Sequence, residues 1–309
     1  MSGSLAGATG TITVDLAQIA TNWRALAAKV APALCAAVVK ADAYGLGAER
    51  VIAALSHAGC TTFFIATPEE AETARKLAPE AHIFALDGLV GGAATAFANQ
   101  GVTPVLSTLD DIAAWAALAR MRGEALPAAL HIDTGLNRLG LPVRDVRRLA
   151  ADPSVLSGLR LELVMSHLAS ADNPRDPKNR DQLLAFETLT ALFPGVPRSL
   201  AASDGLMLGP AYHFNLVRPG YAIYGGQASQ LAPAPVKPAV SSKSSAQAAP
   251  VRNSTTAATG SSAALGSPPT SAPSAAATAT AAPAAPVTIG SATIQPNAST
   301  TTTARRAPA

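Results

Sequence analysis

Short apolar runs alternate with amphipathic segments along roughly the first 225 residues of the chain. Each run is almost continuously apolar, which is typical of a strand covered on both faces of a parallel sheet. Eight runs predict strands, namely LCAAVVKA (34–41), TTFFIAT (61–67), HIFALDG (82–88), TPVLST (103–108), PAALHIDTG (127–135), LELVMSHLA (161–169), RSLAASDG (198–205) and NLVRPGYAIYG (215–225).

Between these runs, apolar positions recur at helical spacing and predict helices over 48–59, 68–78, 110–121 and 180–193. Thr67-Pro68-Glu69-Glu70 is a strong helix start, because a capping residue is followed by proline in the first turn and by a glutamate three positions on. Eight strands spaced by helices within about 215 residues favour a closed barrel over an open doubly wound sheet. The predicted fold class is therefore α/β, a (β/α)8 TIM-type barrel.

The pattern ends near residue 240. From Ser241 to Ala309, 53 of 69 residues are Ala, Ser, Thr or Pro, and all 13 aromatic residues lie at or before Tyr224. Such a segment lacks the large apolar groups needed to bury a core. We therefore predict a barrel over 12–226, a linker over 227–240 that leads into a strand, and a disordered tail over 241–309.

Charge and cysteine usage exclude several classes of function. Residues 1–224 carry 18 Lys+Arg against 20 Asp+Glu, so the positive charge of the whole chain comes from five scattered basic residues nearer its C-terminus. These basic residues lack interleaved aromatics, so we expect no nucleic-acid partner. Two cysteines cannot build a disulfide framework, and the histidines and cysteines lack metal-ligand spacing. With no signal peptide and no run of ~18 apolar residues, no membrane association and a cytoplasmic location are expected.

Candidate chemistry follows the C-terminal ends of the predicted strands, where barrel enzymes carry their active sites. The side chains there are Lys40, Arg138, His167, Ser203 and Arg218. After four apolar residues, Lys40 is either an amine that reaches solvent or an amine in an apolar setting that forms a Schiff base. His167 taken alone is typical of a hydrogen-bonded core histidine, and Arg218 of a rim arginine paired with a carboxylate.

The motifs taken together are specific. The chain resembles the bacterial alanine racemases over roughly 12–240, and the resemblance implies a barrel that binds pyridoxal 5'-phosphate. It implies an amino-acid racemase that interconverts L-alanine and D-alanine, supplies D-alanine for peptidoglycan and forms a homodimer. The resemblance rests on five motifs in order, VVKADAYGLG (38–47), HIDTGLNRLG (131–140), SHLASAD (166–172), LAASDG (200–205) and NLVRPGYAIYGG (215–226).

The resemblance also implies a role for each matching residue. Lys40 would hold the cofactor as a Schiff base and act as the base for the α-proton of D-alanine. Arg218 would face the pyridine nitrogen and His167 the hydroxyl side of the ring, while Arg138 would support substrate and cofactor binding. The phosphate would be held by Tyr44, Ser203 and the backbone at Gly220 and Tyr221.

Three positions depart from the family pattern. His131 stands where many members carry a lysine, modified to a carbamate, that orients the arginine seven residues later, so Arg138 must be positioned differently. Ala202 replaces the asparagine usual before the phosphate serine, and Asp204 follows that serine where a neutral residue is expected. A carboxylate beside a phosphate is unfavourable, so we expect Asp204 to turn away or the phosphate to be held less tightly.

The family uses a second base, a tyrosine from a β-rich second domain of the partner subunit. No tyrosine follows Tyr224 in this chain, and residues 227–240 resemble only the start of that domain. Losing one positioned proton-transfer group lowers a rate by ~10²–10⁴-fold. Three hypotheses stay open, an alanine racemase, a pyridoxal-phosphate-binding barrel without robust catalysis, and a non-functional truncated product of a reading-frame change near Ser241.

Overall fold

The apolar runs form parallel strands that pair in chain order. The computed structural model of the chain describes residues 10–227 and 235–244. One sheet joins seven parallel strands in sequence order, each paired with the next. Its strands are β3 (Ala37–Val38), β4 (Thr62–Ile65), β5 (His82–Ala85), β6 (Thr103–Leu106), β7 (Leu126–His131), β8 (Leu159–Met165) and β9 (Arg198–Ser199).

Two further strands close this sheet into a barrel. β2 (Leu34–Cys35) lies one residue before β3 and pairs in parallel with β10 (Leu216–Val217). On the other side of β10, the Arg218 N–H donates to the Ala201 carbonyl at 2.9 Å, just beyond β9. Because β2 and β3 are one interrupted strand, the ring has eight members, and the predicted barrel is confirmed.

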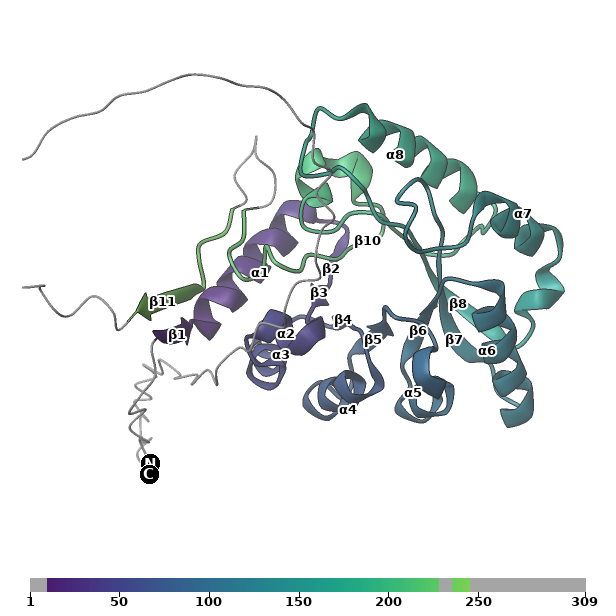
Figure 1. Cartoon of the computed structure of the whole chain (residues 1–309), viewed down its shortest axis with the longest axis horizontal. Helices are drawn as coiled ribbons and strands as arrows, with labels where there is room; N and C mark the ends of the chain where they lie inside the picture. The colour runs from purple at the N-terminus through teal and green to yellow at the C-terminus, as the bar shows by residue number, and fades with distance from the viewer. Residues whose placement is uncertain (1–9, 228–234, 245–309) are drawn as a thin grey trace, which may run out of the picture. The chain divides into compact units, whose positions relative to one another are not determined.

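Helices cover the outside of the strands (Figure 1). The four helices predicted from the periodic pattern are confirmed, with ends within a few residues of those expected. The connection between β9 and β10 differs, since it holds two short 3₁₀ helices, η3 (Gly205–Leu208) and η4 (Pro210–Tyr212). The α-helices are α1 (Leu16–Val30), α2 (Lys40–Gly45), α3 (Ala48–His57), α4 (Pro68–Leu77), α5 (Ala94–Gln100), α6 (Leu109–Arg122), α7 (Val143–Ala151) and α8 (Pro177–Thr190), with 3₁₀ helices η1 (Val90–Gly92) and η2 (Pro153–Leu156).

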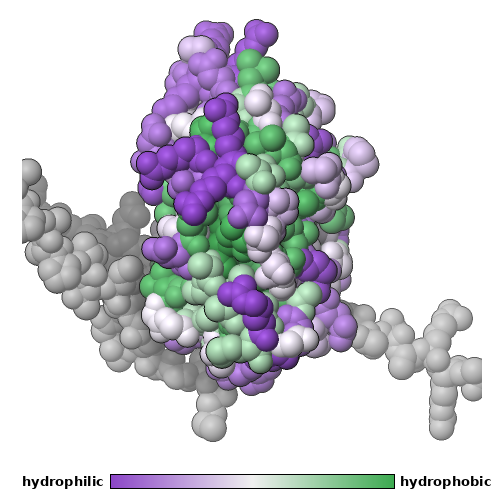
Figure 2. Space-filling model, turned by 90° about the vertical axis from the view of Figure 1, so that its right-hand side faces the viewer, coloured by the Kyte–Doolittle hydropathy of each residue, from purple (hydrophilic) through white to green (hydrophobic). Residues whose placement is uncertain are grey.

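The strands bury side chains on both faces, as their continuous apolar pattern predicts. On β4, Phe63 belongs to the large cluster that includes the helices, whereas its neighbour Phe64 belongs to a second cluster contributed by the strands. Phe64 stacks on Phe84 of β5, with ring centroids 4.8 Å apart. Because neighbouring residues of a strand point to opposite faces, this second cluster lies on the face of the strands away from the helices, inside the barrel. On the face shown in Figure 2, hydrophilic residues cover much of the surface, with hydrophobic residues visible between them.

The segment after the barrel is tied to α1. Asn22 is buried, its side-chain amide donates to the Ile223 and Lys237 carbonyls at 2.9 and 2.8 Å, and its Oδ1 accepts from the Lys237 N–H at 3.0 Å. A further strand, β11 (Val240–Ser244), pairs with β1 (Gly10–Val14) in a separate two-stranded sheet. β11 therefore runs across the predicted boundary at Ser241, while residues 245–309 of the predicted tail lie outside the described part. None of the described helices is long and apolar enough to span a membrane.

Candidate active site

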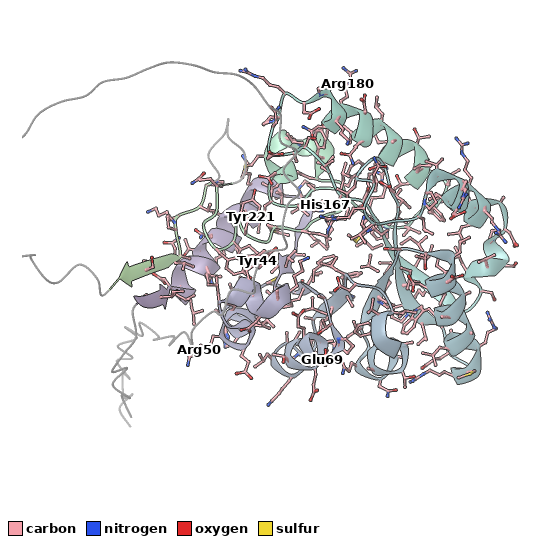
Figure 3. The ribbon with its side chains drawn as sticks, viewed as in Figure 1. Tyr44, Arg50, Glu69, His167, Arg180 and Tyr221 are labelled. Atoms are coloured by element: carbon pink, nitrogen blue, oxygen red, sulfur yellow. The ribbon has the colours of Figure 1, made fainter. Side chains whose placement is uncertain are left out.

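A cavity of about 370 Å³ opens at the C-terminal ends of the strands, a volume typical of small-molecule sites. All eight side chains and backbone positions expected from the sequence line it. The lining residues are Val38, Lys40, Tyr44, Leu86, Asp87, His131, Arg138, Leu139, Met165, His167, Ala202, Ser203, Asp204, Arg218, Gly220 and Tyr221. Tyr44, His167 and Tyr221 are labelled near the centre of Figure 3, whereas Arg50, Glu69 and Arg180 lie at the periphery.

Lys40 begins a left-handed turn rather than ending a strand. The predicted strand over 34–41 stops at Val38, and the residues after Lys40, from Ala41 to Tyr44, have φ between 53° and 60°. Non-glycine residues rarely adopt this conformation, because the Cβ atom crowds the neighbouring carbonyl oxygen. The turn brings Lys40 and Tyr44, four residues apart, to the same cavity.

The Ser203 hydroxyl accepts hydrogen bonds from two backbone N–H groups, and one of them belongs to the glycine next to Tyr44. Its Oγ accepts hydrogen bonds from the Gly220 N–H at 2.9 Å and from the Ala222 N–H at 3.3 Å. At Gly220 a Cβ atom would overlap the hydroxyl of Tyr44, so only glycine lets the tyrosine approach this closely. Backbone amides flanked by glycine and short hydroxyls form a recess suited to a small anion.

Asp204 lines the cavity beside this recess and is hydrogen-bonded to a tyrosine. The Tyr221 hydroxyl donates to Asp204 Oδ1. Burial, together with this hydrogen bond and the negative charge of Asp204, raises the pKa of Tyr221 above its ordinary value. The extra carboxylate noted in the sequence is therefore paired with a side chain of the next motif.

Arg218 is buried, and its guanidinium is held by several hydrogen bonds. Only 3% of its surface is exposed, its guanidinium donates to Ser199 Oγ at 2.5 Å and to the Ser166 carbonyl at 2.7 Å, and it lies 5.9 Å from the centre of the Phe64 ring. Burial lowers the pKa of Arg218, but a guanidinium stays protonated at neutral pH. A fixed positive charge therefore lines the cavity.

Two histidines lie close to this charge. Burial, and then the nearby Arg218, lower the pKa of His131 from 6.5 to about 4 and that of His167 from 6.5 to about 3. Both imidazoles are consequently neutral at pH 7. His131 is 4% exposed, and its Nε2 has no hydrogen-bond partner among the described residues. His131 lines the cavity, so a buried polar atom of a cavity residue has hydrogen-bonding capacity that the described residues leave unused.

Arg138 lies on a loop whose backbone N–H groups bind the side chain of Asp133. Asp133 Oδ1 accepts from the N–H groups of Gly135 and Asn137 at 2.9 and 3.1 Å, and a Cβ at Gly140 would overlap the Asp133 backbone. Arg138 is exposed, and no hydrogen bond or ion pair holds its side chain within residues 10–227 and 235–244. The sequence predicts that a group other than a carbamate positions Arg138, and none of the described residues forms a hydrogen bond or ion pair with its side chain.

Sequence reasoning missed residues that shape the cavity without bearing recognisable chemistry. Leu86 and Asp87 follow β5 and lie outside the five motifs, whereas Leu139 lies within the second motif but was given no role. It also treated Glu70 only as part of a helix start, whereas its carboxylate binds the backbone next to Lys40. Among the described residues, no three His, Cys, Asp or Glu side chains come together to hold a metal ion.

Comparison with known proteins identifies relatives along most of the barrel. The family described as "Alanine racemase, N-terminal domain" matches residues 14–228. An alanine racemase from Methylobacterium sp. (strain 4-46) is 47% identical over 229 residues, which are 74% of this chain and 63% of that relative. The biosynthetic alanine racemase of Agrobacterium fabrum is also 47% identical, over 74% of this chain and 58% of its own length. The chain thus spans less than two thirds of these relatives.

Solved structures agree with the fold. An alanine racemase from Bartonella henselae with covalently bound pyridoxal phosphate is 37% identical with a TM-score of 0.73, covering 77% of this chain and 69% of that one. A biosynthetic alanine racemase from Pseudomonas aeruginosa is 32% identical with a TM-score of 0.69, covering 75% of this chain and 65% of that one. The resemblance read from the five motifs is therefore confirmed at the level of the family.

Proposed function

The chain belongs to the alanine racemase family through its N-terminal domain, and we propose that its cavity binds pyridoxal 5'-phosphate and carries out the barrel's share of alanine racemisation. The proposal rests on one observation. The cavity that contains Lys40 also contains the recess formed by Ser203, Gly220 and Tyr44. An amine and an anion-binding recess match the two functional ends of that cofactor, its aldehyde and its phosphate.

The residues present fit the cofactor on several counts. The Gly220 position has no room for a Cβ beneath the Tyr44 hydroxyl, and the Ser203 hydroxyl lies beside two backbone donors. The unpartnered Nε2 of His131 leaves hydrogen-bonding capacity in a residue that lines the cavity. We infer that Ser203, Tyr44 and the backbone at Gly220 and Tyr221 hold the phosphate, while Lys40 holds the aldehyde carbon.

Each side chain then has a defined task. When bound, pyridoxal 5'-phosphate withdraws electrons from the α-carbon of an attached amino acid and makes its proton acidic. The Lys40 amine would take or return that proton on one face. Arg218, held by Ser199 and Ser166, would donate to the ring nitrogen and keep it unprotonated, which limits side reactions. Neutral His167 would donate beside the ring hydroxyl, and Arg138 would bind the substrate carboxylate.

A second candidate function is a cofactor-binding barrel without robust catalysis. One sequence fact favours it, since no tyrosine follows Tyr224 to serve as the second proton-transfer group that the family resemblance implies. A cytoplasmic location and a homodimeric state stay predictions. So does the third hypothesis, a non-functional product whose barrel does not retain the cofactor.

Cofactor binding is tested by absorbance and reduction. The 309-residue chain incubated with pyridoxal 5'-phosphate should develop a visible band, and borohydride should fix the cofactor on Lys40, located by peptide mapping. Lys40→Ala should abolish the band and the fixed label, whereas Lys76→Ala, on the exposed side of α4, should keep both. A wild-type chain that never binds the cofactor, or a label spread over several lysines, would reject the proposal.

The same preparation distinguishes the candidate functions. Inversion of L-alanine or D-alanine by the loaded chain, measured by chiral chromatography, supports the racemase. A loaded chain that leaves alanine unchanged in configuration and retains its α-proton supports the binding barrel. Aggregation without a cofactor band supports the non-functional product.

A further inference from the structure

The left-handed turn that begins at Lys40 forms hydrogen bonds with residues outside the turn. Four consecutive non-glycine residues, Ala41 to Tyr44, have positive φ, and the turn is only six residues long. Each such residue is disfavoured, because its Cβ crowds the backbone, and such conformations persist only where their surroundings fix them. The turn must therefore have anchors beyond its own backbone.

One anchor is the carboxylate of Glu70, which reaches across from α4. Glu70 Oε1 accepts from the Ala41 N–H at 2.6 Å, and Glu70 Oε2 accepts from the Ala66 N–H at 2.7 Å. Ala41 directly follows Lys40, and Ala66 directly follows β4. A single side chain thus joins the first amide of the turn to the end of the neighbouring barrel strand. Charge-assisted hydrogen bonds of this kind are about twice as strong as neutral ones.

A second carboxylate anchors the other end of the turn. Asp42 Oδ1 accepts from the Ala48 N–H at 2.6 Å, at the start of α3. This bond joins the turn to the helix that follows it, but it does not reach the strand from which Lys40 emerges. The backbone adds a link of its own, since the Ala43 N–H donates to the Val39 carbonyl at 2.9 Å. Glu70 is the side chain that joins the first amide of the turn to the neighbouring strand β4.

Both ends of the turn carry groups of the cavity. Lys40 begins it, and the hydroxyl of Tyr44 at its far end lies where a Cβ of Gly220 would be. A shift of the turn would displace the amine and the tyrosine together. We propose that Glu70 is a positioning residue for the cofactor site, fixing the left-handed turn that places Lys40 and Tyr44, an inference that rests on the proposed function.

A purely structural role for Glu70 makes a different prediction. The Glu70 N–H donates to Thr67 Oγ1 at 3.4 Å at the start of α4. Under this alternative, Glu70 only stabilises that helix and does not fix the turn. Thr67→Ala removes this cap and leaves the Glu70 carboxylate in place. Glu69→Gln changes the exposed neighbouring glutamate, labelled at the periphery in Figure 3, and matches the chemical change made at Glu70.

The test compares Glu70→Gln with both controls in the full chain. The substitution keeps the shape of the side chain but turns one acceptor oxygen into an NH₂ group that faces a backbone N–H. Hydrogen exchange of the 41–47 amides in the cofactor-free chain should accelerate about tenfold or more, and the dissociation constant for pyridoxal 5'-phosphate should rise on the order of tenfold. Glu69→Gln should change neither quantity. Thr67→Ala should lower the melting temperature and leave both unchanged.

Relief of the backbone strain supplies an independent check if Glu70→Gln folds poorly. Glycine adopts positive φ without a steric penalty, so Ala41→Gly added to Glu70→Gln should recover part of the exchange protection and part of the cofactor affinity. Wild-type exchange and affinity in Glu70→Gln, or the same losses in Thr67→Ala, would overturn the inference. If the wild-type chain binds no cofactor, the proposed function fails, and the exchange measurement alone still decides whether Glu70 holds the turn.

Discussion

His131 is a neutral imidazole held next to permanent positive charges. It lies at the end of β7, it is buried, and Arg218 and Arg138 both disfavour its protonated form. In an unfolded chain the same histidine titrates near 6.5. The folded protein therefore excludes a proton that the unfolded chain binds, and stability must depend on pH.

The sign of that dependence is definite. Between pH 6.5 and about 4 the unfolded chain binds more protons at His131 than the folded chain, so the free energy of unfolding falls as the pH falls through this window. Below about 4 both states are protonated and the loss from this group is complete. The displacement of the pKa from 6.5 to about 4 corresponds to ~3 kcal/mol.

His131→Gln should remove the part of the fall in the free energy of unfolding at low pH that His131 causes. A glutamine cannot be protonated, so the variant should lose ~3 kcal/mol less than the wild-type chain between pH 7 and 4, measured by urea unfolding at several pH values. Some slope should remain, because His167 titrates in the same direction. His57→Gln, at an exposed helix end, is the matched control. Identical slopes for His131→Gln and the wild-type chain would show that His131 is not buried as described.

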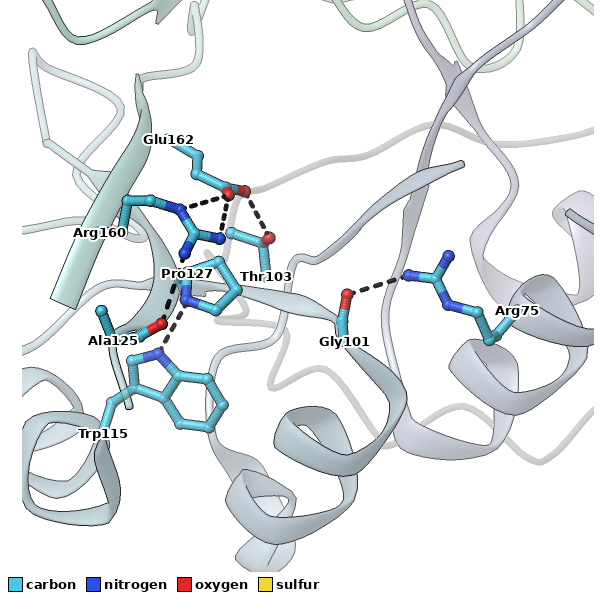
Figure 4. Close-up of polar contacts among 8 residues, drawn as sticks. All are labelled: Arg75, Gly101, Thr103, Trp115, Ala125, Pro127, Arg160 and Glu162. Atoms are coloured by element: carbon cyan, nitrogen blue, oxygen red, sulfur yellow. Dashed lines mark hydrogen bonds and ion pairs between the residues drawn. The ribbon is translucent and has the colours of Figure 1, made fainter. Parts of the chain in front are cut away.

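At the scale of elements, the opposite end of the barrel is fastened by polar contacts between helices and strands (Figure 4). Arg75 on α4 donates to four backbone carbonyls, those of Pro79, Ala81, Gln100 and Gly101, at 2.7 to 3.0 Å. It thereby joins α4 to the segments that enter β5 and β6. Nearby, Glu162 Oε2 accepts from the Thr103 hydroxyl at 2.9 Å, and Trp115 donates to the Pro127 carbonyl at 2.9 Å.

Arg75→Lys should destabilise the barrel without affecting the cavity. A lysine keeps the charge, but its single ammonium cannot match the forked geometry that reaches four acceptors. The free energy of unfolding should fall by about 2 kcal/mol, since hydrogen bonds to charged groups contribute ~1.5–3 kcal/mol. Urea unfolding measures the loss, and Lys76→Arg on the exposed side of α4 is the control. The dissociation constant for pyridoxal 5'-phosphate should stay the same, and a parallel loss of affinity would contradict the separation of the two barrel ends.

The elements were predictable where one physical signal governed them. Continuous apolar runs located the barrel strands, and the cap at Thr67 located the start of α4. The turn after Lys40 was not predictable, because Ala41 and Ala43 have no local preference for positive φ. That conformation is imposed by partners distant in sequence, such as Glu70, 29 residues from Ala41. The site residues predicted from the motifs line one cavity, but their roles stay predictions. The pairing of Tyr221 with Asp204 was not predictable, because the fold brings together two residues of different motifs.

At the scale of the whole molecule, the strands bring the groups proposed for cofactor binding, and for proton transfer on one face of the substrate, to one end of the barrel. Lys40 begins the turn after β3, His131 is the last residue of β7, His167 follows β8 and Arg218 follows β10. Tyrosines occur only at 44, 212, 221 and 224. Tyr212 and Tyr224 do not line the cavity, the Tyr221 hydroxyl donates to Asp204, and Tyr44 belongs to the proposed phosphate recess. Within the described residues, no tyrosine is therefore left over as a second proton-transfer group.

A chain that has Lys40 but no second positioned proton-transfer group should exchange the α-proton of alanine faster than it inverts the α-carbon. In D₂O, the 309-residue chain loaded with pyridoxal 5'-phosphate should incorporate deuterium at the α-carbon of D-alanine through Lys40 while largely retaining its configuration. Inversion should be slower than exchange by about 10² or more, the usual effect of lacking one positioned proton-transfer group. NMR measures the exchange and chiral chromatography the inversion, and Lys40→Ala should abolish both. Inversion as fast as exchange would mean that residues 1–309 supply a second proton donor, and Tyr221→Phe would then be the first variant to examine.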